Sequence, residues 1–422
     1  MGGEDLYKKI TLDNGVRVVM EKIPHVRSVS IGIWIGTGSR NENRTNNGIS
    51  HFIEHMLFKG TRHRSARDIA RSIDNIGGQL NAFTGKECTC YYTKTLDSHI
   101  DIAVELLADM FFNSKFAKRD IDVERKVIIE EIGMYEDSPE ELVHDILLET
   151  VWGNNSLGYP ILGTQECLKT FNRDVIIDYI GRSYIPGNVV VAVAGNYDEG
   201  KLLELVNRYF GNWKSNAGYS VMDEDIVFSA NTRVKEKDTE QVHICLGFDG
   251  IEQGKDELYT LLAINNILGG GMSSRLFQKI REEMGLVYSI YSYPSAYKNA
   301  GLFTVYAGMN PEQLTKVIRL IIGEIKELLR DGLENEDLRM SKEQLKGNYI
   351  LGLESTSSRM NSIGKSELTL GRIFTPEQVL EKMDRIEMES VRNVMEKVFN
   401  LEKMSLSAVG NIKRDIDLNT IL

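Results

Sequence analysis

The chain has 422 residues, 42% of them hydrophobic, which is enough for two or more globular domains with substantial cores. Its formal net charge of -11 argues against nucleic acid or an anionic membrane surface as the main partner and mildly favours basic partners. No apolar run approaches the roughly 18–20 residues of a membrane span, and the first residues resemble neither a signal nor a transit peptide, so we expect a cytoplasmic protein.

The first predicted element that carries chemistry is a helix over residues 47–59, which Gly60 ends. At about 100° per residue, His51 and His55 lie about 40° apart and Glu54 lies about 60° from His51, with the apolar side chains on the opposite face. Imidazoles four residues apart can reach one ion at about 2.0–2.1 Å without distorting the helix. The H-x-x-E-H order therefore predicts a metal site in which Glu54 is a general base and not a ligand.

A catalytic zinc ion takes three protein ligands, so a third ligand is expected elsewhere in the chain. The predicted helix over residues 120–137 offers several acidic side chains. Glu124 and Glu131 lie within about 20° of one another in an apolar stripe of this helix, whereas Glu130 points about 100° away toward solvent. The angles leave Glu124 and Glu131 equally placed as the third ligand.

A solvated helix face is the competing interpretation of the H-x-x-E-H run. We favour the metal site because its two faces are cleanly separated, two glutamates follow at matching angles, and histidine is scarce. The other histidines have no such company and are expected at the surface or in satisfied core positions: His25, His63, His99, His144 and His243. The four cysteines have no CxxC spacing and predict neither a disulfide framework nor a thiolate zinc site.

Two short echoes predict a duplicated domain. The run Val193-Ala194-Gly195-Asn196 returns as Ala408-Val409-Gly410-Asn411, an offset of 215 residues, and the strand-like run from Val29 returns from Val242, an offset of 213. Because the two offsets nearly agree, duplication explains them better than chance. The expected division is an N-terminal catalytic domain over 1–214, a linker over 215–227 and a C-terminal noncatalytic domain over 228–422.

Each half mixes short β-rich runs with longer helices and lacks strict βαβ alternation. This pattern predicts an α+β fold of two homologous domains, each a mainly antiparallel sheet packed with helices, forming a clamshell-like chain. The C-terminal half has no counterpart of the two histidines. Only the first half is therefore expected to bind metal.

These runs together resemble the pitrilysin-type zinc peptidases (family M16, the inverzincins), and especially their short bacterial members and the β subunit of the mitochondrial processing peptidase. The resemblance extends over both halves, through GISHFIEHMLFKGT, IGGQLNAFTGKECTCYY, ERKVIIEEIGMYEDSPEE, YIPGNVVVAVAGN and LGGGMSSRLFQKIREEMGLVYSI. It implies a zinc-dependent metalloendopeptidase that hydrolyses extended peptides or unfolded segments, with one Zn²⁺ per chain.

The resemblance also separates the two tied glutamates. It places the distal metal ligand at Glu131 and a supporting acid at Glu124. His51, His55 and Glu131 would then hold zinc, while Glu54 acts as the base and Glu124 orients a ligand or the local electrostatics.

The resemblance further implies residues that bind substrate. An edge strand beside the metal would pair with the substrate backbone through Asn81, Ala82, Phe83 and Thr84. In the second half, Arg281 and Tyr288 match a family pair that reaches the substrate. Peptides are the expected partners, and the acidic balance of the chain favours basic ones.

The run Gly269-Gly270-Gly271 resembles, in shortened form, a glycine-rich loop of the noncatalytic α subunit of the processing peptidase. Its presence on the same chain as the metal motif predicts a homodimer. A phosphate-binding loop is disfavoured because no GxxxxGK[ST] follows. Two other functions compete: a noncatalytic structural or assembly subunit, whose relatives lose metal-site residues, and an iron oxygenase, which the helical spacing fits poorly.

Overall fold

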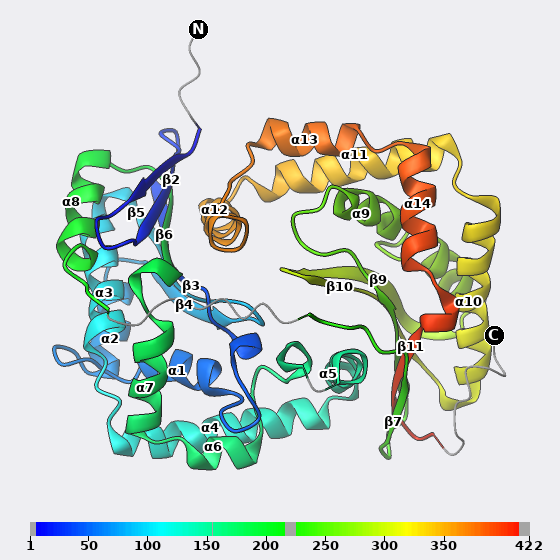
Figure 1. Ribbon diagram of the computed structural model, residues 1–422, viewed down its shortest axis with the longest axis horizontal. Helices are drawn as coiled ribbons and strands as arrows, with labels where there is room; N and C mark the ends of the chain where they lie inside the picture. The colour runs from blue at the N-terminus through cyan, green and yellow to red at the C-terminus, as the bar shows by residue number, and fades with distance from the viewer. Residues whose placement is uncertain (1–5, 154, 216–224, 413–422) are drawn as a thin grey trace, which may run out of the picture. The chain divides into compact units, whose positions relative to one another are not determined.

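The computed structural model describes residues 6–153, 155–215 and 225–412, and these form two compact units (Figure 1). Among the described residues, the first unit comprises 6–132, 160–215 and 351–375, and the second comprises 133–153, 155–159, 225–350 and 376–412. Each unit thus includes one segment from the other half of the sequence. Residues 216–224 of the expected linker lie outside the described residues.

The first unit is built on a six-stranded sheet with one parallel pair, β2 and β6, and antiparallel neighbours elsewhere. In spatial order its strands are β1 (Lys8–Thr11), β2 (Arg17–Lys22), β6 (Val189–Gly195), β3 (Ser28–Ile35), β5 (Thr89–Leu96) and β4 (Gln79–Thr84). Among the described residues, strand β4 pairs only with β5 and forms one edge of the sheet. The predicted edge position of residues 81–84 is therefore confirmed.

Both faces of the first sheet are covered, since β6 is buried at every position and β3 at every position except its first. In β3, Val29, Ile31 and Ile33 face one core, whereas Trp34 faces another, as the two-residue repeat of a strand requires. The first core is closed by α1 (Ile49–Leu57), α3 (Ile100–Asn113), α7 (Arg173–Ser183) and α8 (Glu199–Phe210). The second is closed by α12 (Thr356–Leu370), a helix from the other half of the sequence.

The second unit repeats this plan with five strands and one parallel pair, β7 and β11. In spatial order they are β7 (Thr232–Glu236), β11 (Ser405–Gly410), β8 (Val242–Asp249), β10 (Ala300–Met309) and β9 (Val287–Tyr297). Helix α5 (Pro139–Trp152), from the first half of the sequence, covers one face. On the other face Phe399 packs edge-on against Phe248 and Phe303. Near it lie α9 (Glu257–Leu268), α10 (Leu314–Asp331) and α14 (Met388–Val398).

The duplication predicted from the two echoes is visible in the backbone. Gly195 ends β6 at φ +134°, and Gly410 ends β11 at φ +143°. A β-carbon on Gly195 would lie 2.3 Å from the Ser28 carbonyl oxygen, and one on Gly410 would lie 2.8 Å from that of Gln241. Both positions therefore require glycine for the same reason, a left-handed backbone pressed against the start of the neighbouring strand. The predicted α+β class with two related antiparallel sheets is confirmed.

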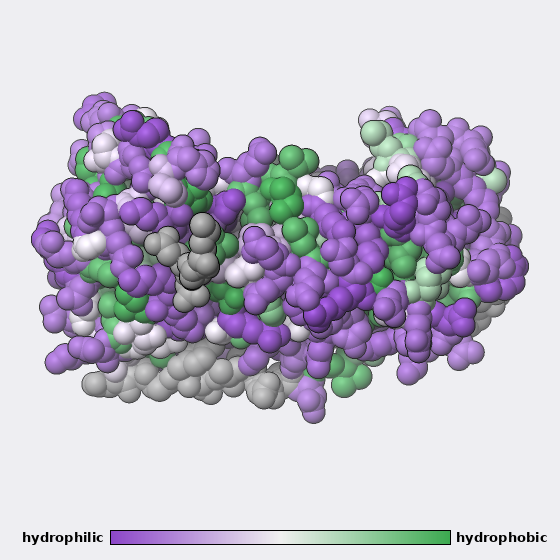
Figure 2. All heavy atoms as spheres, turned by 90° about the horizontal axis from the view of Figure 1, so that it is seen from above, coloured by the Kyte–Doolittle hydropathy of each residue, from purple (hydrophilic) through white to green (hydrophobic). Residues whose placement is uncertain are grey.

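The remaining helices are α2 (Ala66–Asp74), α4 (Lys118–Asp137), α6 (Gln165–Thr170), α11 (Asn335–Gly352), α13 (Pro376–Asp384) and a π-helix over Phe277–Glu283. Short 3-10 turns occupy Ser39–Asn41, Asp97–His99, Ser156–Gly158, Pro186–Asn188, Pro311–Gln313 and Leu401–Lys403. None of the helices in the described part of the chain combines the length and apolarity that a membrane crossing needs. Hydrophilic side chains cover most of the face seen in Figure 2, and hydrophobic ones appear in small groups.

Candidate metal centre

Helix α1 presents two histidines on the side opposite to its core contacts. The side chains of Ile49, Phe52 and Ile53 are fully buried, so the apolar face predicted from the sequence is fixed against the first core. The His51 side chain is 9% exposed and that of His55 is 24% exposed. The ring centroids lie 4.6 Å apart, so the i and i+4 imidazoles stand side by side.

Helix α4 brings Glu131 to these two rings. Its Oε2 atom lies 3.9 Å from Nε2 of His51 and 3.7 Å from Nε2 of His55. One donor atom from each of the three residues lies within 4.8 Å of the other two. Ligands around one tetrahedral zinc ion at 2.0–2.1 Å stand about 3.3 Å apart, so the observed spacing is slightly wider than a closed site requires.

The three donors are chemically suited to a divalent cation. Burial, and then the neighbouring His55, lower the pKa of His51 to about 3, so His51 is neutral at physiological pH and has a lone pair to offer. The nitrogen–oxygen distances to Glu131 are too long for hydrogen bonds, and His51 Nδ1 is buried without a partner. Two imidazoles and a carboxylate that converge on one point fit zinc.

Glu124 supports His55 from the side away from Glu131. Its Oε2 lies 3.2 Å from Nδ1 of His55, and its Oε1 lies 2.8 Å from Nζ of Lys59. The Glu124 side chain is only 2% exposed, so its charge depends on these partners. An Nδ1–H donated to Glu124 leaves Nε2 of His55 free to bind a cation, which is the usual arrangement of a metal-bound histidine.

Glu54 stands one residue before His55 and is held by the edge strand. The hydroxyl of Thr84, at the end of β4, donates a hydrogen bond of 2.5 Å to Oε2 of Glu54. Burial raises the pKa of the Glu54 carboxyl, although Thr84 and His55 oppose the shift. A raised pKa suits a group that must take up and release a proton near neutral pH.

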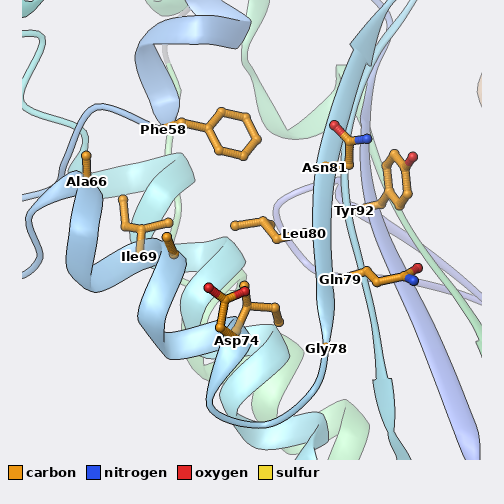
Figure 3. A pocket seen from close by; sticks show the side chains of 11 residues that line it. Phe58, Ala66, Ile69, Asp74, Gly78, Gln79, Leu80, Asn81 and Tyr92 are labelled. Atoms are coloured by element: carbon orange, nitrogen blue, oxygen red, sulfur yellow. The ribbon is translucent and has the colours of Figure 1, made fainter.

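A pocket of about 550 Å³ lies between α2 and the beginning of β4 (Figure 3). Its apolar wall is formed by Phe58, Ala66, Ile69, Ala70, Ile73 and Leu80, and its polar side by Asp74, Gln79, Asn81 and Tyr92. Phe58 directly follows α1, and Leu80 points into the pocket from β4. The pocket therefore adjoins both helix α1, which carries the two histidines, and the edge strand β4.

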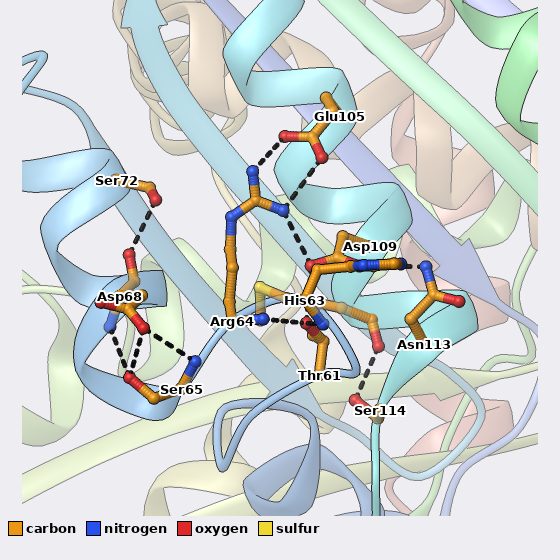
Figure 4. Close-up of polar contacts among 11 residues, drawn as sticks. Thr61, His63, Arg64, Ser65, Asp68, Ser72, Glu105, Asp109, Asn113 and Ser114 are labelled. Carbon is orange, nitrogen blue, oxygen red and sulfur yellow. Dashed lines mark hydrogen bonds and ion pairs between the residues drawn. The ribbon is translucent and has the colours of Figure 1, made fainter.

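The loop between α1 and α2 is fixed by a buried carboxylate of α3 (Figure 4). Asp109 accepts hydrogen bonds from Oγ1 of Thr61 at 2.7 Å, Nη1 of Arg64 at 2.8 Å and Nδ2 of Asn113 at 2.9 Å. Arg64 also pairs with both oxygens of Glu105. This network holds α2, and with it the pocket wall, at a set position relative to α1.

In the second unit, Arg281 and Tyr288 lie close together. The Arg281 guanidinium carbon is 5.9 Å from the centre of the Tyr288 ring and 4.8 Å from that of Phe277. Tyr288 is 74% exposed. Arg281 belongs to the π-helix, a geometry that is frequent at functional sites. The structure thus pairs these two residues, and their role toward a substrate stays a prediction.

The structure brings His51, His55, Glu54, Glu124 and Glu131 together, and their chemical roles remain predictions. It distinguishes the two glutamates that the helical angles left tied, since Glu131 faces both rings and Glu124 only one. The apolar stripe expected beside them is half formed, with Ile128 buried and Val127 45% exposed.

Lys59 was missed by the sequence argument. It lies four residues after His55 and about 40° from it on an ideal helix, a spacing that could have indicated a third member of the cluster. Of the other histidines, His25 and His63 are exposed, whereas His144 and His243 form hydrogen bonds with tyrosine hydroxyls.

Comparison with known proteins identifies relatives over most of the chain. The insulinase family (peptidase family M16) matches residues 17–165, and the peptidase M16 inactive domain matches residues 170–345. The chain is 48% identical to the uncharacterised zinc protease YmxG of Bacillus subtilis over 394 residues, which are 93% of this chain and 96% of that protein. It is 40% identical to an uncharacterised zinc protease of Streptomyces coelicolor over 420 residues, 97% and 91% of the two chains.

Solved structures share the fold at lower identity. A protease from Helicobacter pylori aligns with a TM-score of 0.89 at 22% identity, covering 96% of this chain and 99% of its own. A peptidase M16 inactive domain from Pseudomonas fluorescens aligns with a TM-score of 0.90 at 18% identity, covering 97% and 100%.

Proposed function

Because the chain belongs to peptidase family M16, we propose that it is a zinc-dependent metalloendopeptidase that cleaves extended peptides or unfolded segments. The observation that carries this proposal is the convergence of His51, His55 and Glu131 from two separate helices. A noncatalytic subunit of the same fold is not favoured, because the donor set and the adjacent Glu54 are all present.

Zinc held by these residues would supply a Lewis acid that acidifies a water molecule and polarises the peptide carbonyl. Glu54 accepts the proton of the attacking water and delivers it to the leaving amine. Thr84 fixes one oxygen of Glu54 and so limits how far the carboxylate can turn. Glu124 keeps the His55 ring in place through Nδ1, and Lys59 balances the charge of Glu124.

The edge strand β4 is proposed to hold the substrate backbone through Asn81, Ala82, Phe83 and Thr84, because its outer side has no partner strand within the described sheet. Arg281 and Tyr288 are proposed as further substrate contacts, since an exposed tyrosine and a guanidinium can both bind peptide groups. The net charge of -11 favours basic peptides.

The pocket beside β4 suggests which substrate side chains are selected. Strand β4 runs from the pocket at Gln79 toward Glu54 at Thr84. A peptide paired antiparallel to β4 would therefore reach the pocket with a residue on the C-terminal side of the cleaved bond. The apolar wall fits a branched aliphatic or aromatic side chain there.

We also propose that the protein is a cytoplasmic homodimer with one zinc ion per chain. The homodimer is proposed from the Gly269-Gly270-Gly271 run, because this run stands on the same chain as the metal motif. Light scattering of the purified protein and metal analysis would give the stoichiometry. A monomer at micromolar concentration would contradict the dimer without affecting the peptidase proposal.

The experiment that tests the function compares the wild-type protein with Glu54→Gln on a library of random peptides. The wild type should cleave, a chelator should stop it, and zinc should restore it. Glu54→Gln should keep the zinc content of the wild type, because Glu54 is not among the three clustered donors, while kcat falls by about 10²–10⁴-fold. Near-normal turnover by this variant, or wild-type cleavage that survives chelation, would refute the mechanism.

A further inference from the structure

A buried glutamate lies at the beginning of helix α1 and is not among the residues of the candidate metal centre described above. Glu42 is 2% exposed and precedes α1 by seven residues. Its Oε2 accepts hydrogen bonds from the backbone N–H of Gly48 at 2.7 Å and from Nδ2 of Asn47 at 2.9 Å. Its Oε1 accepts from the backbone N–H of Ser50 at 2.8 Å.

These contacts replace the usual helix cap. The N-cap residue of α1 is Gly48, which has no side chain to accept from the first free N–H groups of the helix. Gly48 has φ +94°, and a β-carbon there would lie 2.7 Å from the Leu162 carbonyl oxygen, so the space excludes a capping side chain. Glu42 supplies the acceptor from outside, and its charge favours the N-terminal end of a helix.

The residue that follows Ser50 is His51, and the two histidines are held in different ways. His55 is oriented through its ring, by Glu124 at Nδ1. The Nδ1 atom of His51 is buried without a hydrogen-bond partner, so no such contact orients that ring. The direction of the His51 side chain therefore depends on the backbone at the beginning of α1.

A second tether acts on the same turn. The Ser50 hydroxyl lies 3.0 Å from the Tyr179 hydroxyl, which in turn lies 2.9 Å from Oγ1 of Thr37. All of these groups are buried. Ser50 is thus held through both its backbone N–H and its side chain.

We propose that Glu42 is a positioning residue of the metal site, which does for His51 through the backbone what Glu124 does for His55 through the ring. The inference rests on the proposed zinc site. Its consequence is that loss of the Glu42 carboxylate weakens zinc binding beyond any general effect on folding. Support of this kind for a ligand is commonly worth 10- to 100-fold in metal affinity.

The test is Glu42→Gln, measured by competition for zinc with a chromophoric chelator. A glutamine has the size of the glutamate, but its amide nitrogen must face the N–H donor at Gly48 or the one at Ser50, so at least one hydrogen bond is lost. We expect zinc affinity to fall by about tenfold or more, and kcat at saturating zinc to change less.

The matched control is Glu21→Gln. Glu21 is 1% exposed, lies in β2 of the same unit and pairs with Arg359 of α12, away from α1. Because the carboxylate it replaces is also buried, Glu21→Gln should lower the free energy of unfolding while keeping the zinc affinity of the wild type. Equal zinc affinity in Glu42→Gln and the wild type, or an equal loss in the control, would overturn the inference.

Two further outcomes keep the test decisive. If Glu42→Gln does not fold, Glu42→Asp keeps the charge but shortens the side chain, so its carboxylate cannot keep its contacts with both Gly48 and Ser50. An unchanged zinc affinity in that variant overturns the inference. If the wild type binds no zinc that depends on His51 and His55, the proposed function fails as well. Zinc binding by the wild type with no loss in Glu42→Gln defeats the positioning role alone.

Discussion

The two units share one sheet plan but differ in the side chains carried by the helix that follows the matching strand. In the first, the strand β3 is followed by α1, whose outer face carries His51 and His55. In the second, the corresponding strand β8 is followed by α9, where Ile264 and Leu268 stand four residues apart and are fully buried. Both units retain the strand order and the left-handed glycine.

The comparison shows that the repeated fold occurs with and without the candidate metal donors. Helix α9 buries its residues at these i and i+4 positions in the core. Helix α1 has them at a partly open surface and buries other residues instead. A glutamate from a second helix, α4, completes the cluster in the first unit. The proposed metal site thus depends on a few side chains that the repeated backbone does not itself specify.

The largest effect is expected from the loss of Glu131, the third donor, because the first unit should then bind zinc no better than the second. Glu131→Gln leaves two imidazoles, too few ligands for a catalytic zinc site. Zinc affinity should fall by more than the roughly 100-fold that loss of a supporting residue can cause, and cleavage should fall with it. Metal analysis after dialysis, together with kcat/KM on a cleaved peptide, measures both losses.

The neighbouring residue offers the control. Glu130 is exposed and points away from the rings, so Glu130→Gln makes the same chemical change one position earlier on α4. It should keep zinc and activity. If both variants lost zinc equally, the cluster around Glu131 would not be the binding site.

A smaller effect is expected at Lys59, which has no role in the core. Lys59→Met removes the cation beside Glu124 and leaves a 2% exposed carboxylate without it. Zinc affinity should drop by about 10- to 100-fold, because His55 loses a firmly held partner. Lys59→Arg retains the charge and should recover most of that loss in the same chelator competition. An affinity unchanged in Lys59→Met would remove Lys59 from the site.

Much of this site follows from helical periodicity, because both α1 and α4 are amphipathic. The angle around a helix axis shows that Glu124 and Glu131 share a face, but the residues lie about 10 Å apart along that axis. Which of them faces both histidines, and which faces only His55, depends on how α4 crosses α1, and no single-helix pattern contains that crossing. The same limit applies to α5 and α12, whose apolar faces are evident while the sheet that each covers is not.

The shared glycine allows the two units to be compared directly by stability. Gly195→Ala and Gly410→Ala each place a β-carbon at positive φ against a neighbouring strand, which should cost about 1–3 kcal/mol of unfolding free energy. Gly195→Ala should be the worse, because its β-carbon would approach backbone oxygen to 2.3 Å, compared with 2.8 Å for Gly410. Denaturant unfolding measures both, and a cost in only one unit would contradict the structural equivalence.

The mildest change should appear in substrate choice. Ala70 is exposed on α2 and lines the pocket beside β4, so Ala70→Phe fills that space without touching the metal donors. Zinc binding should be unchanged, while peptides with a large apolar residue after the cut lose about 10-fold or more in kcat/KM relative to peptides with alanine there. Arg71→Phe adds the same ring one residue later, outside the pocket lining, and should leave the preference intact. Sequencing of the cleaved library for the three proteins decides the matter, because an unaltered preference in Ala70→Phe would mean that substrate side chains do not enter this pocket.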